Sequence, residues 1–184
     1  ELKFILNERE LSYAMSWLNK IGVQSPYPIR SINSLYYDNV THEAVESNLS
    51  GLPHRHKVRL RWYGEGSVNA HPIIEIKSRN GRLGFKERYK MPFDSLYAYK
   101  KPLHKVSKKI FQHFSSNYFE SFLLKNFLVS RLFVTYERNY YEYIDQIRMT
   151  IDKNVMFSQP IQSISLKSLG HIRYHNYILE IKFP

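Results

Sequence analysis

Apolar and polar residues alternate along several short segments of the chain, and this two-residue period predicts β-strands. The alternation is strict in KVRLRWY at 57–63 and in IIEIKSR at 73–79. Asn80-Gly81 then indicates a hairpin turn before FKERYKM at 85–91. Further strand-like segments lie at 3–6, 30–38, 132–141, 148–153 and 177–183. The chain is therefore predicted to be rich in antiparallel strands.

Three other regions are predicted to be helical: 8–21, 41–49 and 93–128. The first has apolar residues three or four positions apart and is followed by Gly22, a suitable C-cap. The second is expected to start from Thr41 as its N-cap. The third is predicted to be a mainly helical insertion, clearest at 106–128. The expected fold class is α+β, in a single domain that spans 1–184.

Residues two positions apart on a strand point to the same face of a sheet, so each strand can be divided into two faces. One face is apolar. The other collects twelve bases, which are Lys3, Lys57, Arg59, Arg61, Lys77, Arg79, Lys86, Arg88, Lys90, Arg138, Arg148 and Lys182. The acids on it are Glu1, Glu75, Asp152 and Glu180. An ordinary solvent-facing sheet surface explains any one strand, but over seven strands the excess of bases indicates a surface for a polyanion.

The composition supports an anionic partner and excludes several kinds of site. The 27 Lys and Arg residues outnumber the 16 Asp and Glu residues, which gives a formal charge of +11. Nucleic acid, an acidic membrane surface and a polyphosphorylated small molecule all fit this charge. There is no Cys, so a disulfide scaffold, a zinc knuckle and a thiol nucleophile are excluded. No apolar run approaches the ~20 residues of a membrane span.

The chain opens at Glu1 without a Met and closes directly after a strand-like segment. We expect a trimmed fragment of a cytoplasmic protein. A membrane would be reached only through segments that this chain lacks.

Seven segments in order make the sequence similar to a known superfamily. They are ELKF at 1–4, SLYYDN at 34–39, KVRLRWYG at 57–64, IEIKSRNGRLGFKER at 74–88, VTYERNYY at 134–141, RMTID at 148–152 and YILEIKF at 177–183. Over nearly its whole length the chain resembles the VTC-type polyphosphate polymerase domain of the triphosphate tunnel metalloenzyme (CYTH-like) superfamily. The resemblance implies a closed eight-stranded antiparallel β-barrel, the triphosphate tunnel, with flanking and inserted helices.

The resemblance also implies roles for individual residues. The expected catalytic residues are Arg59, Arg61, Lys77 and Arg138. The residues expected to bind substrate are Lys3, Lys86, Arg88, Arg148 and Lys182. The cofactor, Mn²⁺ or Mg²⁺, is expected at Glu180, and Glu1 and Glu75 are weaker candidates for binding the metal or for orienting lysines.

The expected function is polymerisation of polyphosphate, in which the terminal phosphate of a nucleoside triphosphate, with ATP as the expected donor, joins a growing polyphosphate chain. A phosphate acceptor is already anionic at neutral pH, whereas water needs a carboxylate base, so a face rich in bases favours the phosphate acceptor. The alternatives are a metal-dependent tripolyphosphatase or nucleoside triphosphatase, and a non-catalytic polyphosphate-binding domain. Nucleic acid is not expected as the partner, because no RRM-like aromatic motif is present, and the oligomeric state is not predicted.

Overall fold

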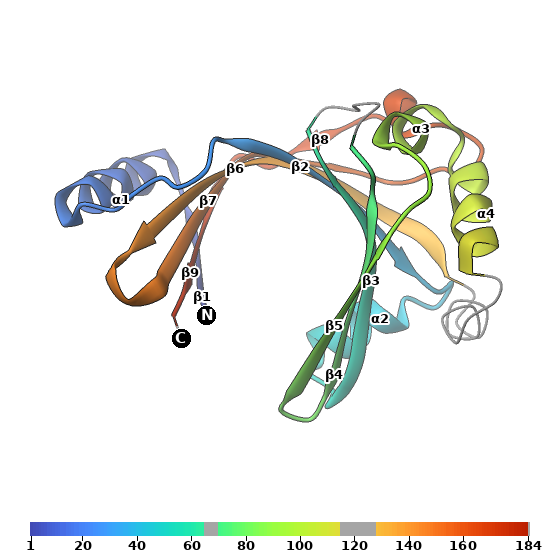
Figure 1. Ribbon diagram of the computed structural model, residues 1–184, viewed down its shortest axis with the longest axis horizontal. Helices are drawn as coiled ribbons and strands as arrows, with labels where there is room; N and C mark the ends of the chain where they lie inside the picture. The colour runs from blue at the N-terminus through green and yellow to red at the C-terminus, as the bar shows by residue number, and fades with distance from the viewer. Residues whose placement is uncertain (65–69, 115–127, 184) are drawn as a thin grey trace. The chain divides into compact units, whose positions relative to one another are not determined.

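The computed structural model describes residues 1–64, 70–114 and 128–183. The chain forms two compact units (Figure 1). Unit 1 comprises Glu1–Ile32, Val134–Phe157 and His171–Pro184. Unit 2 comprises Asn33–Phe133 and Ser158–Gly170. Three strands, β2 (Arg30–Asp38), β6 (Val129–Tyr143) and β7 (Ile147–Ser158), contribute residues to both units.

The described residues contain nine strands and four α-helices. The remaining strands are β1 (Leu2–Leu6), β3 (His54–Tyr63), β4 (Ile73–Asn80), β5 (Leu83–Lys90), β8 (Ile172–Arg173) and β9 (Tyr177–Lys182). The helices are α1 (Glu8–Ile21), α2 (Glu43–Leu49), α3 (Ser95–Lys100) and α4 (Leu103–Phe114). None of these helices combines the length and the apolar composition that crossing a membrane requires.

All strands belong to one sheet, with the order β1-β9-β7-β6-β2-β3-β4-β5 and the short β8 beside β7. The pairs β1–β9, β7–β9, β7–β8, β3–β4 and β4–β5 are antiparallel. The α+β class and the antiparallel strands are therefore confirmed. Closure of the eight main strands into a barrel stays a prediction, as does the single-domain organisation.

In unit 1, helix α1 packs on the apolar face of strands β1, β9 and β7. The register pairs Phe4 with Leu179 and Leu179 with Ile151, so these side chains share one face. Leu18 of α1 is fully buried in the same cluster as Leu179 and Ile151. Each fully buried aliphatic side chain stabilises the fold by roughly 1.5–3 kcal/mol, so this contact fixes α1 on its sheet face.

Helix α1 coincides with the predicted range 8–21, and its ends explain why. The Asn7 side chain accepts from the Glu10 amide at 2.9 Å, and the Glu10 carboxylate accepts from the Asn7 amide at 2.8 Å. This reciprocal pair satisfies two amides at the helix start. Gly22 ends the helix in the left-handed conformation, with φ 73°, where a side chain would be strained.

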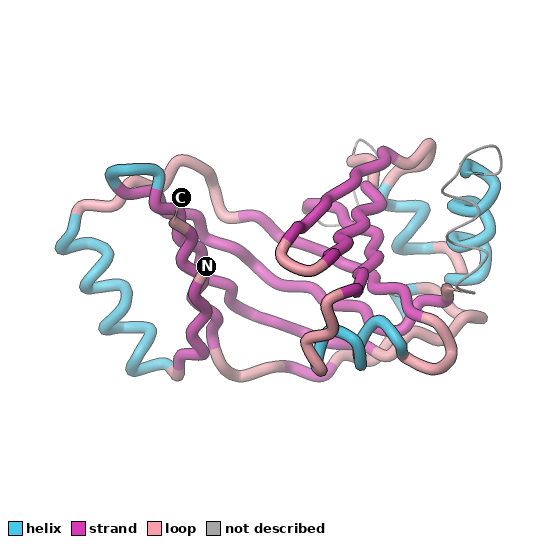
Figure 2. Tube along the Cα trace, turned by 90° about the horizontal axis from the view of Figure 1, so that it is seen from below, coloured by secondary structure: helices cyan, strands magenta, loops and turns pink. Residues whose placement is uncertain are grey.

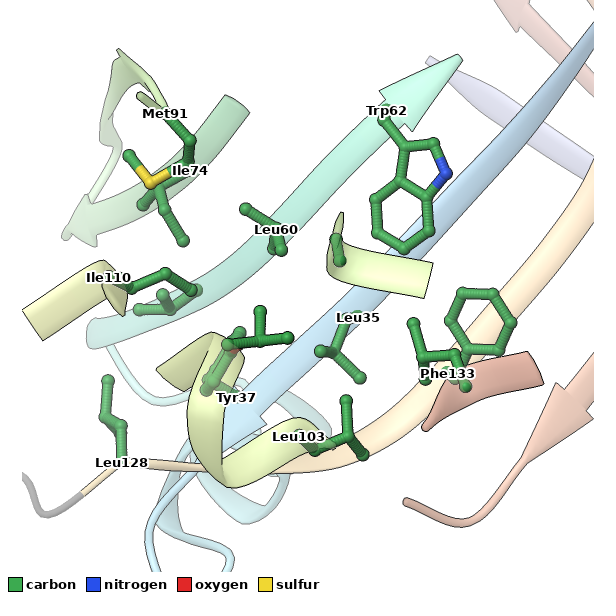
Figure 3. Packing of buried hydrophobic residues seen from close by; sticks show 14 of the residues in the cluster. Leu35, Tyr37, Leu60, Trp62, Ile74, Met91, Leu103, Ile110, Leu128 and Phe133 are labelled. Atoms are coloured by element: carbon green, nitrogen blue, oxygen red, sulfur yellow. The ribbon is translucent and has the colours of Figure 1, made fainter. Parts of the chain in front are cut away.

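In unit 2, strands β3, β4 and β5 run side by side as a meander (Figure 2). Their apolar faces pack against helices α3 and α4, and Figure 3 shows Leu60 and Ile74 of the strands with Leu103 and Ile110 of α4. These four side chains are at most 3% exposed. Trp62 stacks on Phe133 in the same core, with ring centroids 5.9 Å apart. Burial of this face leaves the opposite face of the meander for charged residues.

Predicted limits differ from the structure at helix α2 and at the hairpin turn. Helix α2 starts at Glu43, and Thr41 is not its N-cap. Instead, Asp38 accepts from the Ala44 and Val45 amides at 3.0 and 3.1 Å, so a carboxylate at the end of β2 satisfies the free helix amides. The hairpin turn lies one residue later than predicted, at Gly81-Arg82, because Asn80 still pairs with Leu83.

The segment predicted as a helical insertion contains two helices. Helix α3 ends at Lys100, and helix α4 reaches Phe114, the last described residue before 128. Residues 115–127 lie outside the described residues, so the later part of this prediction is not tested.

Candidate functional site: two clusters of arginines and carboxylates

The strand register of unit 2 arranges its charged residues in rows. Lys57, Lys77 and Lys86 lie directly opposite one another on β3, β4 and β5. The next row consists of Arg59, Glu75 and Arg88, and the one after it of Arg61, Ile73 and Lys90. Directly opposed residues share a face of the sheet. The strand alternation seen in the sequence therefore produces one basic face, with Glu75 near its centre.

Glu75 binds the bases around it through both carboxylate oxygens. Its Oε2 accepts from Arg59 Nε at 2.8 Å and Nη2 at 2.5 Å, and lies 3.9 Å from Arg61 Nη1. Its Oε1 lies 2.9 Å from Lys86 Nζ and accepts from Arg88 Nε at 3.1 Å. We call these five residues the Glu75 cluster. Four bases surround one carboxylate, so the cluster keeps a large positive charge and suits an anionic ligand.

The electrostatics of the Glu75 cluster keep its carboxylate ionised. Burial of Glu75 raises its pKa, but hydrogen bonds and positive charges from Lys86 and Arg59 outweigh burial and lower the pKa from 4.5 to about 2. Glu75 is 3% exposed, so solvent weakens these interactions little. A carboxylate with so low a pKa is a very weak base at neutral pH.

Arg59 and Arg61 are also held by the hydroxyl groups of two uncharged side chains. Arg59 Nη1 donates to the Tyr36 hydroxyl at 3.1 Å, and Arg61 Nε donates to the Ser34 hydroxyl at 3.1 Å. Both partners lie on β2. Burial lowers the pKa of Arg59, but the interactions with Tyr36 and Glu75 outweigh burial and raise the pKa overall, so its guanidinium stays charged. Arg59 and Arg61 are therefore fixed in direction.

Unit 1 contains a second cluster, centred on Arg138 of β6. Arg138 Nε donates to Asp152 Oδ1 at 2.6 Å, and Nη2 donates to Asp152 Oδ2 at 2.7 Å. The Tyr136 ring lies 5.2 Å from the Arg138 guanidinium carbon, in a cation–π arrangement. Burial lowers the pKa of Arg138, but its hydrogen bonds to Asp152 and the nearby charges raise it overall.

Glu180 joins this pair to the residues of strand β1. Its Oε2 lies 3.7 Å from Arg138 Nη2, and its Oε1 lies 3.0 Å from Lys182 Nζ. Lys182 Nζ also lies 3.6 Å from Glu1, and Glu1 lies 3.3 Å from Lys3 Nζ. Burial raises the pKa of Glu1, but Lys3 and Lys182 lower it overall. We call Arg138, Asp152, Glu180, Lys182, Glu1 and Lys3 the Arg138 cluster.

The structure thus gathers most of the predicted site residues into two groups. Arg59, Arg61, Lys86 and Arg88 each contact Glu75 in unit 2, with Lys77 in the neighbouring row. Arg138, Glu180, Lys182, Glu1 and Lys3 form the second group, and Arg148 lies opposite Lys182. Glu75 belongs to unit 2, whereas the other expected metal ligands, Glu1 and Glu180, belong to unit 1. That both groups line one tunnel stays a prediction.

Sequence analysis did not pair the arginines with the residues that fix them. Tyr136 shares a face with Arg138 by the period of two, but its contact with the guanidinium is seen only in the structure. Tyr36, Ser34 and Asp152 come from other strands, and only the register between strands brings them to their arginines.

Comparison with known proteins identifies a family and two similar folds. The VTC domain family matches residues 1–184. Among functionally curated proteins, none matches the sequence significantly. Two solved structures are similar in fold, each with low sequence identity. The PH1819 protein from Pyrococcus horikoshii OT3 has a TM-score of 0.50 and 12% identity over 100% of this chain and 76% of that one.

The second is a putative adenylyl cyclase from Hippeastrum, HpAC1, with a dominant triphosphatase activity. Its TM-score is 0.51 at 11% identity, over 98% of this chain and 77% of that one. At such identities these likenesses concern the fold alone. The sequence match, by contrast, spans the full chain. The chain belongs to the VTC domain family.

Proposed function

We propose that the chain is a metal-dependent polyphosphate polymerase, which transfers the terminal phosphate of a nucleoside triphosphate to the end of a polyphosphate chain. ATP is the proposed donor. In this proposal Arg59, Arg61, Lys77 and Arg138 neutralise the transferring phosphate. Lys3, Lys86, Arg88, Arg148 and Lys182 bind the other phosphates of donor and acceptor.

The main support is that the carboxylates of the basic face are already bound by bases. Glu75 accepts from Arg59 and Arg88, and its pKa is lowered to about 2. Asp152 accepts two hydrogen bonds from Arg138, through Nε and Nη2. Such groups are poorly suited to remove a proton from water. A terminal phosphate, with a second pKa near ~6, is an anionic nucleophile at neutral pH and needs no base.

Arginine suits the remaining task, which is to neutralise charge that spreads over the phosphate oxygens. Its guanidinium stays charged and can bind two oxygens at once. Arg59 and Arg61 are 14% and 11% exposed, so their interaction with a phosphate would be screened little by water. Their fixed directions reduce the reorganisation that the transfer step needs.

The donor set favours a divalent metal at Glu180 and Glu1 over one at Glu75. Glu180 and Glu1 approach the same Lys182 ammonium, so their carboxylates lie close together. Carboxylate oxygens are ligands that Mn²⁺ and Mg²⁺ accept, and such ions usually take their other ligands from substrate phosphates and water. A bound metal would neutralise charge on the leaving group. Glu75 fits the role of orienting the bases, because both its oxygens are occupied by cations.

The alternative with specific support is hydrolysis on the same fold, since HpAC1 is described with a dominant triphosphatase activity. A third possibility is binding of polyphosphate without turnover. All three proposals use the same bases, so only the products separate them.

The test is incubation of the protein with ATP and Mn²⁺, followed by analysis of the products on a polyphosphate gel. We expect a ladder of polyphosphate, which Lys77→Ala abolishes and Lys100→Ala, on helix α3, leaves unchanged. Free phosphate without a ladder would replace the proposal with hydrolysis. No product, with tight binding of polyphosphate, would replace it with a binding domain.

A further inference from the structure

Asp152 lies on the basic face by its position in the sequence, which assigns it no role in the site. In the structure it is 6% exposed and contacts a proposed catalytic arginine through both carboxylate oxygens. Two parallel hydrogen bonds between an arginine and a carboxylate fix the plane of the guanidinium as well as its position. From this geometry we infer that Asp152 is a positioning residue, which aims Arg138 at the substrate phosphate.

The donor atoms that Asp152 binds determine which edge of the Arg138 guanidinium remains available to a ligand. A guanidinium has five N–H donors. Asp152 takes the Nε donor and one donor of Nη2, which together form one edge of the group. The adjacent edge, between Nη1 and the second Nη2 donor, is not used by Asp152. That edge is the one that can bind two phosphate oxygens at once, so the ion pair orients Arg138 without blocking it.

A second contact restricts the remaining freedom of Arg138. The guanidinium carbon lies over the Tyr136 ring, 5.2 Å from its centroid, whereas Asp152 lies at an edge of the guanidinium. Glu180 Oε2 is 3.7 Å from Nη2, too far for a hydrogen bond, so Glu180 adds charge without fixing direction. Among these neighbours, Asp152 therefore determines where the unused edge points.

The Glu75 cluster provides an independent parallel within unit 2. Arg59 also donates through Nε and Nη2 to one buried carboxylate, and a tyrosine, Tyr36, is its other neighbour. The same combination of arginine, carboxylate and tyrosine therefore occurs in each unit. This supports a common purpose, which is to hold an arginine in a fixed direction before the anion arrives.

The inference rests on the proposed function, in which Arg138 contacts phosphate. It predicts that Asp152→Asn and Arg138→Ala each weaken tripolyphosphate binding by on the order of 10- to 100-fold. It also predicts that the double variant is no weaker than Arg138→Ala alone, because Asp152 acts through Arg138. Isothermal titration calorimetry with tripolyphosphate measures all four proteins. Additive losses in the double variant would overturn the inference.

A purely structural role for Asp152 is tested with Asp152→Glu, which keeps the charge but displaces the guanidinium by one methylene. We expect a folded protein with weakened tripolyphosphate binding. Wild-type affinity in this variant would overturn the inference. Asp38→Asn is the matched control, since Asp38 is also buried, at 3% exposed, and holds the amides of α2. It should lower the unfolding midpoint and leave the affinity unchanged.

Two further results separate a positioning role of Asp152 from metal binding and from failure of the proposed function. If Asp152 bound the metal instead, Asp152→Asn would raise the Mn²⁺ concentration needed for half-maximal activity. We expect that concentration to stay at its wild-type value, and a rise would overturn the inference.

If wild-type protein fails to bind tripolyphosphate, the proposed function itself is wrong. If wild type binds and the Asp152 variants bind equally well, only the positioning role is wrong.

Discussion

Arg59 and Glu75 lie directly opposite each other on β3 and β4, and Arg59 donates twice to the same Glu75 oxygen, at 2.8 and 2.5 Å. The same carboxylate also contacts Lys86 and Arg88 through its other oxygen. Like charges on neighbouring strands repel, so these bases require a carboxylate between them to remain close in the absence of ligand. The arrangement presents a concentrated positive charge to an anion, and the buried Glu75 offsets the repulsion among the bases.

The pH dependence of stability should reveal this role of Glu75. Its folded pKa of about 2 is below the usual 4.5, so the carboxylate stabilises the fold at pH values above 4.5, and this contribution is lost as the pH falls toward 2. The shift corresponds to on the order of 3 kcal/mol. Urea unfolding should therefore show Glu75→Gln as less stable than wild type at pH 7, with the gap closing between pH 5 and pH 2. A gap that is constant over this range contradicts the assignment.

Arg59 should be needed for polyphosphate binding and should not be replaceable by Lys. Arg59→Ala removes a partly desolvated contact and should weaken polyphosphate binding on the order of 100-fold. Arg59→Lys should restore little, because an ammonium cannot bind two oxygens in one plane. A competition assay with polyphosphate against single-stranded RNA measures both variants. Equal affinity of wild type for the two ligands, with a mild effect of Arg59→Ala, would favour a nucleic-acid surface instead.

Glu180 is predicted to serve the metal and not the phosphate chain. Glu180→Gln should abolish Mn²⁺-dependent turnover and leave triphosphate binding partly intact, since the bases remain. Glu87→Gln is the matched control, because Glu87 lies on the opposite face of β5 and contacts Tyr89. Turnover with Mn²⁺ and calorimetry with triphosphate are the two measurements. Normal turnover in Glu180→Gln would reject this assignment.

Thr150 lies opposite Glu180 in the register of β7 and β9, and its hydroxyl oxygen is buried without a hydrogen-bond partner among the described residues. An unsatisfied buried hydroxyl destabilises a fold. Thr150→Val, which keeps the shape, should therefore stabilise the protein without ligand by about 1 kcal/mol. Thermal unfolding measures this effect. A decrease in the unfolding midpoint would show that the hydroxyl has a stabilising partner.

The sequence predicted the strands and the basic face well, because both follow from the period of two. Lys57, Arg59 and Arg61 must share a face wherever β3 lies in the sheet. The pairing of acids with bases could not be predicted in this way. That Glu75 meets Arg59, and Asp152 meets Arg138, depends on the register between strands and on side-chain direction.

The N-cap signal at Thr41 failed because residues at the end of the preceding strand competed with it. Thr41 is a good N-cap residue by type, but Asp38 and Asn39 accept the first amides of α2 instead. Asp38 is buried at the end of β2, so its position is set by the strand and not by the helix. By contrast, the Asn7–Glu10 capping box and Gly22 are local, and the sequence predicted the limits of α1 correctly.

In the proposed reaction a phosphate, and not water, accepts the transferred phosphoryl group. The experiment that decides this is the reaction with ATP and Mn²⁺ in water labelled with heavy oxygen, with the products read by phosphorus NMR. We expect polyphosphate in which the transferred phosphates contain no heavy oxygen, because the attacking oxygen comes from phosphate. Free phosphate containing one heavy oxygen for each ATP consumed would show that water is the acceptor, and the proposed polymerase would be wrong.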